Sequence, residues 1–210
     1  MTRLAIVGSG DLGQLIAYHA QMDKHYEVVG FFDDYKIVSE KVDEYPILGK
    51  IDDIIRLYSN GSFDCILLAI GYKHMEFREK VFVELYDKIP FGKIIHSSCY
   101  VDPSCRIADG SVLLPGCTLD RNVIIKENVL LNTRVTIAHD STVQEHSFLS
   151  PCVSMAGFST IGKKCIIGIN STIIDNIVIA DNVQLGGASV VIKDIEQRGL
   201  YVGNPVRFVR

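Results

Sequence analysis

The segment Gly8-Ser9-Gly10-Asp11-Leu12-Gly13 has the spacing of a phosphate-binding loop. Glycines let the backbone approach a phosphate closely, and the N-terminus of a following helix supplies N–H donors and a partial positive charge. An acidic pair, Asp33-Asp34, follows the next apolar segment, about where a carboxylate would contact a ribose. The pattern predicts that this segment binds a nucleotide diphosphate, and a purely structural tight turn is the alternative.

The elements around this loop indicate a small α/β domain. The apolar run Leu4–Val7 reads as a buried strand, and apolar residues at helical spacing follow the loop. Strands are then expected at 28–32 and 65–70, and helices at 51–58 and 74–87. This alternation favours a parallel sheet with crossover helices. Because only about 93 residues are available, a single nucleotide is favoured over a dinucleotide.

A period of six residues dominates the rest of the sequence. From Ile95 to Val191, every sixth residue is large and aliphatic, without a break in register. These positions are Ile95, Val101, Ile107, Leu113, Leu119, Ile125, Leu131, Ile137, Val143, Leu149, Met155, Ile161, Ile167, Ile173, Ile179, Leu185 and Val191. Such a repeat with one deep aliphatic position is typical of a parallel β-helix, in which three hexads form one triangular coil.

Two further positions of the hexad support this interpretation. The residue four after each aliphatic is small or β-branched, which suits a second inward column and explains four of the six cysteines as core residues. These are Cys99, Cys105, Cys117 and Cys165. The residue three after the aliphatic is often Gly, Asn or Asp, which tolerate the left-handed backbone of a tight corner. A catalytic cysteine is the less favoured alternative.

His139 stands two residues after Ile137, at an outward corner of the predicted coil. A solvent-exposed histidine without a function is the alternative for this residue. His146 lies on the next hexad and therefore on another face, and no Cys/His cluster accompanies the two histidines. We therefore expect no metal site.

Composition narrows the classes of partner. The chain has 21 basic and 25 acidic residues, a net charge of −4 and no run of Lys or Arg, so nucleic acid is not an expected partner. No signal-peptide pattern and no apolar stretch of roughly 20 residues is present, so we expect no membrane partner, a cytoplasmic location and reduced thiols.

The hexapeptide pattern resembles that of the hexapeptide acyltransferase superfamily, whose members form left-handed β-helices and assemble as trimers. Leu131-Asn132-Thr133, Ile137-Ala138-His139-Asp140 and Met155-Ala156-Gly157, together with the N-terminal glycine loop, narrow the resemblance. They are similar to the sialic-acid O-acetyltransferase and bacillosamine-type nucleotide-sugar N-acetyltransferase family, over essentially the whole chain. The resemblance implies an α/β Rossmann-like domain at 1–93, a left-handed parallel β-helix at 94–195 and a C-terminal capping tail at 196–210.

The resemblance also implies roles for individual residues. His139 matches the general base that accepts a proton from a sugar amine, and Asp140 matches the acid that orients or polarises it. Asp140 also stands at a turn position that favours aspartate for backbone reasons alone. The remaining matches to the nucleotide sugar are Ser9, Gly10, Asp33, Asp34, Lys36, Gly71 and Asn132. The matches to coenzyme A are Gly157, Ile167, Gly168, Gly186 and Gly187, with the Gly157 N–H near the thioester oxygen.

The function implied is acetyl-CoA-dependent N-acetylation of a nucleotide-linked amino sugar, a 4-amino-4,6-dideoxyhexose, in surface-glycan biosynthesis such as that of lipopolysaccharide. The implied assembly is a homotrimer with active sites at subunit interfaces. Two alternatives remain open. One is O-acetylation of a sugar of the sialic-acid type, and the other is a non-catalytic scaffold that binds nucleotide sugars.

Overall fold

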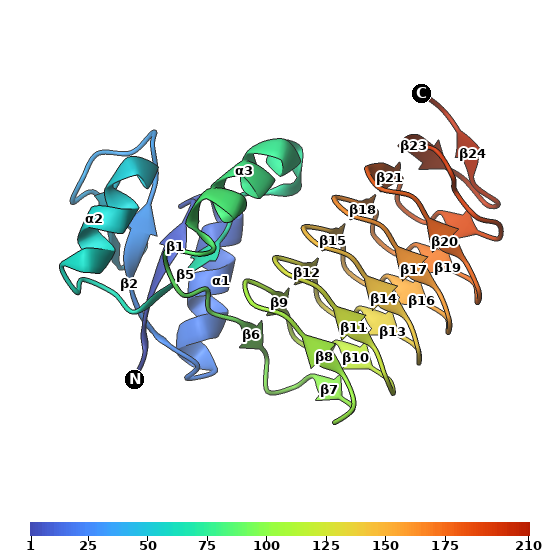
Figure 1. Cartoon of the computed structure of the whole chain (residues 1–210), viewed down its shortest axis with the longest axis horizontal. Helices are drawn as coiled ribbons and strands as arrows, with labels where there is room; N and C mark the ends of the chain where they lie inside the picture. Colours follow the sequence, from blue (N-terminus) through green and yellow to red (C-terminus); the bar gives the residue numbers. More distant parts are fainter. The chain divides into compact units, whose positions relative to one another are not determined.

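A computed structural model describes residues 1–210, which form two units, Met1–Ile94 and Ile95–Arg210. Both are drawn in Figure 1. The elements of the first unit are β1 (Arg3–Val7), α1 (Asp11–Met22), β2 (Glu27–Phe32), β3 (Lys41–Val42), β4 (Tyr45–Gly49), the 3₁₀ turn Ile51–Asp53, α2 (Ile54–Ser59), β5 (Cys65–Leu68), the 3₁₀ turn Tyr72–His74 and α3 (Met75–Leu85).

The first unit is built on a five-stranded sheet in the order β3-β4-β2-β1-β5. β1 is an interior strand that pairs in parallel with β2 and with β5, so the carboxyl ends of all three strands meet at one edge. Leu4–Val7 are fully buried, as expected for an interior strand that is covered on both faces. The glycine loop therefore leaves the sheet at the edge where parallel sheets bind ligands.

The second unit contains seventeen short strands, β6 to β22, followed by two strands of the tail. They are β6 (Ile94–Ile95), β7 (Tyr100–Val101), β8 (Arg106–Ile107), β9 (Val112–Leu113), β10 (Thr118–Leu119), β11 (Ile124–Ile125), β12 (Leu130–Leu131), β13 (Thr136–Ile137), β14 (Thr142–Val143), β15 (Phe148–Leu149), β16 (Ser154–Met155), β17 (Thr160–Ile161), β18 (Ile166–Ile167), β19 (Thr172–Ile173), β20 (Val178–Ile179), β21 (Val183–Leu185), β22 (Val190–Val191), β23 (Gly199–Val202) and β24 (Arg207–Phe208).

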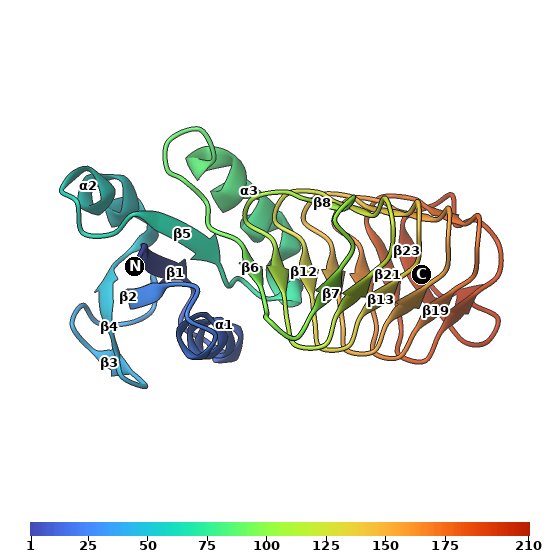
Figure 2. The same cartoon turned by 90° about the horizontal axis from the view of Figure 1, so that it is seen from below.

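These strands stack into three sheets, and each strand from β6 to β19 pairs in parallel with the strand three further along the chain. In the tail, β23 pairs in parallel with β21 and antiparallel with β24. The register matches residues eighteen apart, as in Leu119↔Ile137 and Ile137↔Met155. Three hexads therefore make one coil, and the coils are seen stacked in Figure 2. The aliphatic column fills the interior, where Leu131, Ile137 and Leu149 have no exposed surface.

The corners of the coil confirm the prediction of left-handed backbone. Every sixth residue from Gly110 to Ala188 has a positive φ, between 53° and 76°. Asn and Gly occupy about half of these corners, Asp140 occupies another, and Phe158, Lys164 and others adopt the same conformation without the tolerance of these residue types. The α/β domain followed by a left-handed parallel β-helix is thus confirmed as the fold. None of its helices has the length and apolar character to cross a membrane.

Candidate functional site

His139 and Gly157 occupy the same corner of successive coils. His139 lies two residues after Ile137 of β13, and Gly157 lies two residues after Met155 of β16, and these two strands are hydrogen-bonded neighbours. The stacking places the imidazole directly against the Gly157 backbone. A Cβ at this glycine would lie 2.8 Å from His139 Cε1 and 3.0 Å from Nε2. Only glycine leaves room for the ring in this position.

Asp140 holds the imidazole by its other nitrogen. Its Oδ2 lies 3.0 Å from His139 Nδ1, and its Oδ1 accepts a 2.9 Å hydrogen bond from Asn122 Nδ2. The Arg121 guanidinium lies 3.8 Å from Oδ2. The hydrogen bonds from Asn122 and His139, together with the charge of Arg121, hold the pKa of Asp140 below its usual value. The carboxylate stays ionised and leaves Nε2 of His139 as the nitrogen that can accept a proton.

Two further features surround Nε2. The Gly157 N–H is not used in any backbone hydrogen bond within the chain, so it is a donor available close to the imidazole. The Phe158 ring meets the imidazole edge to face, with centroids 5.1 Å apart and an interplanar angle of 85°. This corner therefore brings together an imidazole, a carboxylate that holds it and a backbone donor, the groups that general-base catalysis of acyl transfer requires.

The other residues assigned to coenzyme A and substrate lie at a different corner. Asn132, Gly168 and Gly186 directly follow β12, β18 and β21, which belong to one eight-stranded sheet, whereas His139 follows a strand of the six-stranded sheet. A Cβ at Gly168 would lie 2.5 Å from the Gly186 carbonyl carbon, so this column presents bare backbone. Ile167 is fully buried in the core, which leaves only its backbone for a ligand. One chain does not bring this column together with His139.

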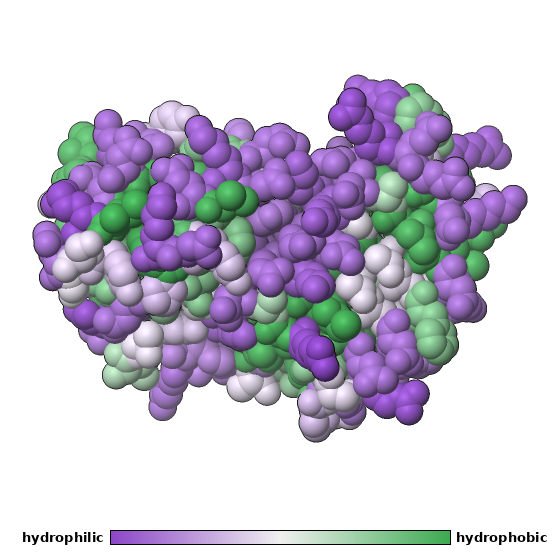
Figure 3. All heavy atoms as spheres, in the orientation of Figure 1, coloured by the Kyte–Doolittle hydropathy of each residue, from purple (hydrophilic) through white to green (hydrophobic).

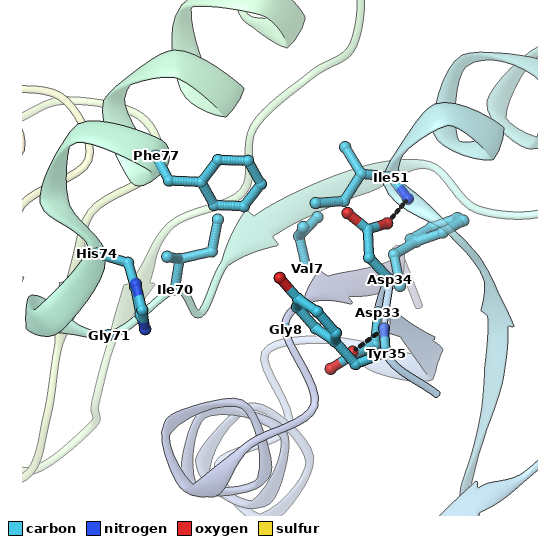
Figure 4. A pocket seen from close by; sticks show the side chains of 11 residues that line it. Val7, Gly8, Asp33, Asp34, Tyr35, Ile51, Ile70, Gly71, His74 and Phe77 are labelled. Atoms are coloured by element: carbon cyan, nitrogen blue, oxygen red, sulfur yellow. Dashed lines mark hydrogen bonds between the residues drawn. The ribbon is translucent and has the colours of Figure 1, made fainter. Parts of the chain in front are cut away.

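A pocket of about 170 Å³ opens at the carboxyl edge of the sheet in the first unit, where Gly8, Asp33, Asp34 and Gly71 form part of its wall (Figure 4). The structure thus brings four residues that the sequence analysis links to the nucleotide together at one pocket. Several residues that the sequence motif did not reveal complete the lining, including Tyr35, Ile51, His74 and Phe77.

Asp33 ties the glycine loop to the end of β2. Its Oδ2 accepts hydrogen bonds from Ser9 Oγ at 2.6 Å and from Ser9 N–H at 3.0 Å, and its Oδ1 accepts one from Tyr35 N–H. Burial raises the pKa of Asp33, but the hydrogen bonds from Ser9 and Tyr35 outweigh burial and hold the pKa below its usual value. Asp33 and Ser9 therefore shape the loop, whereas Asp34 accepts from Ile51 N–H by Oδ1 only.

Three predicted residues of this unit, Ser9, Gly10 and Lys36, do not line the pocket. Gly10 is the N-cap of α1, where no side chain caps the helix and a Cβ would meet no atom within 4 Å. Lys36 forms a 2.9 Å ion pair with Glu40 on the exposed segment after β2. The structure contains no group of three or more His, Cys, Asp or Glu side chains that could hold a metal ion.

Comparisons with known proteins agree with this architecture. Residues 3–85 match the family model of the PglD N-terminal domain. The acetyltransferase domain of PglB from Neisseria gonorrhoeae is 26% identical, with a TM-score of 0.91 over 100% of both chains. The α/β part of the chain thus matches the PglD N-terminal family, and the whole chain is similar to a sugar acetyltransferase domain.

Other acetyltransferase structures share its fold. Perosamine N-acetyltransferase from Caulobacter crescentus superimposes with a TM-score of 0.93, at 21% identity, over 100% of this chain and 98% of the other. WeeI from Acinetobacter baumannii does so with a TM-score of 0.85, at 20% identity, over 100% of both chains. These structures therefore share the order of the two parts of this chain, an α/β unit followed by a β-helix.

Proposed function

We propose that this chain transfers the acetyl group of acetyl-CoA to the amine of a nucleotide-linked sugar. The observation that carries the proposal is the His139 corner, where Asp140 holds Nδ1 and leaves Nε2 beside the Gly157 N–H. The relatives support the choice of reactants. The PglB domain has been solved with acetyl coenzyme A, and perosamine N-acetyltransferase with CoA and GDP-perosamine.

The chemistry follows from these groups. The neutral amine attacks the thioester carbonyl carbon, and its N–H proton moves to Nε2 of His139. The Gly157 N–H donates to the carbonyl oxygen as negative charge develops on it. The carbon–sulfur bond then breaks, and the proton on Nε2 passes to the departing sulfur, which leaves as the CoA thiol. Asp140 stabilises the imidazolium that exists between these two steps.

The nucleotide part of the substrate is assigned to the pocket at the sheet edge. Gly8, Ser9 and Gly10 would bring backbone close to the phosphates at the N-terminus of α1. Oδ2 of Asp34 is available to accept a hydrogen bond from an N–H group of the nucleoside. The identity of the sugar as a 4-amino-4,6-dideoxyhexose, a role in surface-glycan biosynthesis and the cytoplasmic location stay predictions from the family resemblance.

We assign the complete active site to an interface between copies of this chain. His139 and the bare backbone column of Gly168 and Gly186 stand at different corners of one β-helix, so a second copy is needed to join them. Large apolar side chains exposed on this unit, including Phe158 and Val178, favour such an assembly. Figure 3 shows hydrophobic atoms exposed among hydrophilic ones on one face of the molecule. A homotrimer is the assembly that the family resemblance favours.

The decisive experiment measures release of the CoA thiol from acetyl-CoA. The acceptors are UDP-, dTDP- and GDP-linked 4-amino-4,6-dideoxy sugars, and the variant is His139→Ala. We expect one amino sugar to be turned over and the variant to lose roughly 100- to 10,000-fold in kcat, the usual contribution of a general base.

Three results would contradict parts of this assignment. Turnover of sialic acid or another hydroxyl acceptor, with none of any amino sugar, would make the enzyme an O-acetyltransferase. Absence of any turnover, with nucleotide-sugar binding intact, would favour the non-catalytic scaffold. Activity that the His139→Ala change leaves intact would remove this histidine from the mechanism.

A further inference from the structure

Two aromatic side chains line the nucleotide pocket without belonging to the glycine-loop motif. Tyr35 follows the acidic pair at the end of β2 and is 97% exposed, and Phe77 lies on α3 and is 43% exposed. In Figure 4 the two rings come from different walls of the pocket and border the same open space. Such an exposed tyrosine contributes little to the folded core, so its presence at the pocket calls for another role.

The rest of the pocket wall is largely apolar. Val7, Ile51 and Ile70 contribute aliphatic surface between the two rings. The titratable groups are Asp33, whose two oxygens already accept hydrogen bonds from Ser9 and Tyr35, together with Asp34 and His74. An apolar recess with aromatic walls and a carboxylate at one side fits a flat heteroaromatic ring with polar groups on its edge.

We propose that Tyr35 and Phe77 bind the nucleobase of the nucleotide sugar by packing against it from two sides. This inference rests on the proposed function and extends it to residues that the motif does not include. Tyr35 is fixed at its backbone, since its N–H donates to Asp33 Oδ1 at 2.9 Å. Because the backbone of Tyr35 is already held in place, nucleotide binding should restrict only the rotation of its side chain.

Stacking on an aromatic ring accepts any base, because every base presents a π face. Tyr35 and Phe77 therefore supply affinity for the nucleotide and take no part in acetyl transfer, which occurs at the β-helix. Removing either ring should raise the KM for the nucleotide sugar and leave both kcat and the KM for acetyl-CoA unchanged. A change confined to the KM for the nucleotide sugar would distinguish a role in nucleobase binding from a general loss of folded protein.

The test is titration calorimetry of the full-length protein with UDP, dTDP and GDP, using Tyr35→Leu and Phe77→Leu. For the nucleotide that binds most tightly, we expect each change to weaken binding roughly 5- to 100-fold, the usual effect of losing one stacking ring. Tyr35→Phe keeps the ring and should bind like the wild type. Tyr18→Leu is the matched control, because Tyr18 is also exposed, at 58%, on α1 and outside this pocket.

The outcomes separate this inference from the proposed function. Nucleotide affinities that both leucine variants leave unchanged would overturn the aromatic base site, even if the enzyme acetylates an amino sugar. Weakened binding in both variants, combined with no acetyl transfer by the wild type, would support the aromatic nucleobase site and contradict the N-acetyltransferase assignment. A wild type that binds none of the three nucleotides would overturn the base site as well.

Discussion

The proposed base depends on a single neighbouring carboxylate. Asp140 is ionised, contacts His139 Nδ1 at 3.0 Å and is itself held by Asn122. Replacing it with asparagine keeps the size of the side chain but removes the negative charge that stabilises the imidazolium. We expect Asp140→Asn to lower kcat roughly 10-fold or more without changing the KM for acetyl-CoA. Steady-state thiol release measures both constants.

The result for Asp140 also decides between its two interpretations. Asp140 has a φ of 55°, a conformation that asparagine tolerates as well as aspartate does. A purely conformational residue would therefore leave both kcat and the melting temperature unchanged in Asp140→Asn. Such a result would show that the aspartate serves the corner and not the base.

Gly157 offers a second test at the scale of one residue. Its φ lies outside the left-handed region, so alanine suits the backbone, but the added Cβ would lie 2.8 Å from His139 Cε1. The imidazole must move by a substantial fraction of an ångström, and displacement of a reacting group by about 1 Å costs roughly 100-fold in rate. We expect Gly157→Ala to lose activity on that scale while its melting temperature stays near the wild-type value.

The matched control lies on the same corner one coil further along. Asp175→Ala shortens an exposed side chain in this column and introduces no new atom near the imidazole. It should retain normal activity. Full activity in Gly157→Ala would instead show that the observed imidazole position is not the reactive one.

At the scale of elements, the corners of the β-helix are the least favourable local structure. Ala188 is an exposed corner residue with a φ of 56° and gains nothing from its methyl group there. Left-handed backbone costs an L-residue roughly 1–2 kcal/mol, and the extra freedom of an unfolded glycine costs roughly 0.5–1 kcal/mol. We therefore expect Ala188→Gly to stabilise the β-helix by about 0.5 kcal/mol, measured by thermal or denaturant unfolding.

Ala180 supplies the comparison for this prediction. It lies directly after β20, outside the left-handed region, and is half-buried. Ala180→Gly should destabilise the protein by roughly 0.5–1 kcal/mol or more, because the unfolded glycine gains entropy and the methyl group that packs against the core is lost. Changes of the same sign in the two variants would refute the conformational account of the corners.

Much of this fold was predictable because its periodicities are strong. The aliphatic column at every sixth residue fixed the register of the whole β-helix, and its prediction was confirmed down to pairs such as Ile137↔Met155. The short hairpin β3–β4 was not predicted, because Lys41–Val42 and Tyr45–Gly49 are too short to show an alternating pattern. The helix expected at 74–87 begins with a 3₁₀ turn, and α3 itself covers Met75–Leu85.

The site was predictable where a motif encodes it and not where the fold assembles it. Gly8 and the pair Asp33-Asp34 belong to a recognisable pattern, and the structure brings them to one pocket. Phe77 comes from α3, far along the sequence, so only the tertiary fold shows that it reaches the same pocket. Tyr35, which lines the same pocket, follows the acidic pair directly, but an exposed aromatic residue in a loop gives no signal by itself.

At the scale of the whole molecule, the proposed acetyl-transfer site requires residues from two copies of the chain. Asn132 directly follows a strand of the eight-stranded sheet, and His139 follows one of the six-stranded sheet, so they stand at different corners. If a neighbouring copy supplies Asn132 to the site of His139, two inactive variants should repair each other. Mixed assemblies of His139→Ala and Asn132→Ala subunits would contain some interfaces with both residues intact.

We therefore expect each variant alone to be nearly inactive and their co-expressed mixture to recover a substantial part of the wild-type rate. In a trimer with random mixing, about one interface in four pairs an intact His139 with an intact Asn132, which follows from equal chances for each variant at both positions. Mixing the purified variants without subunit exchange provides the control and should give no recovery. Inactivity of the co-expressed mixture, with hybrid trimers shown by mass spectrometry, would place both residues in the site of a single subunit.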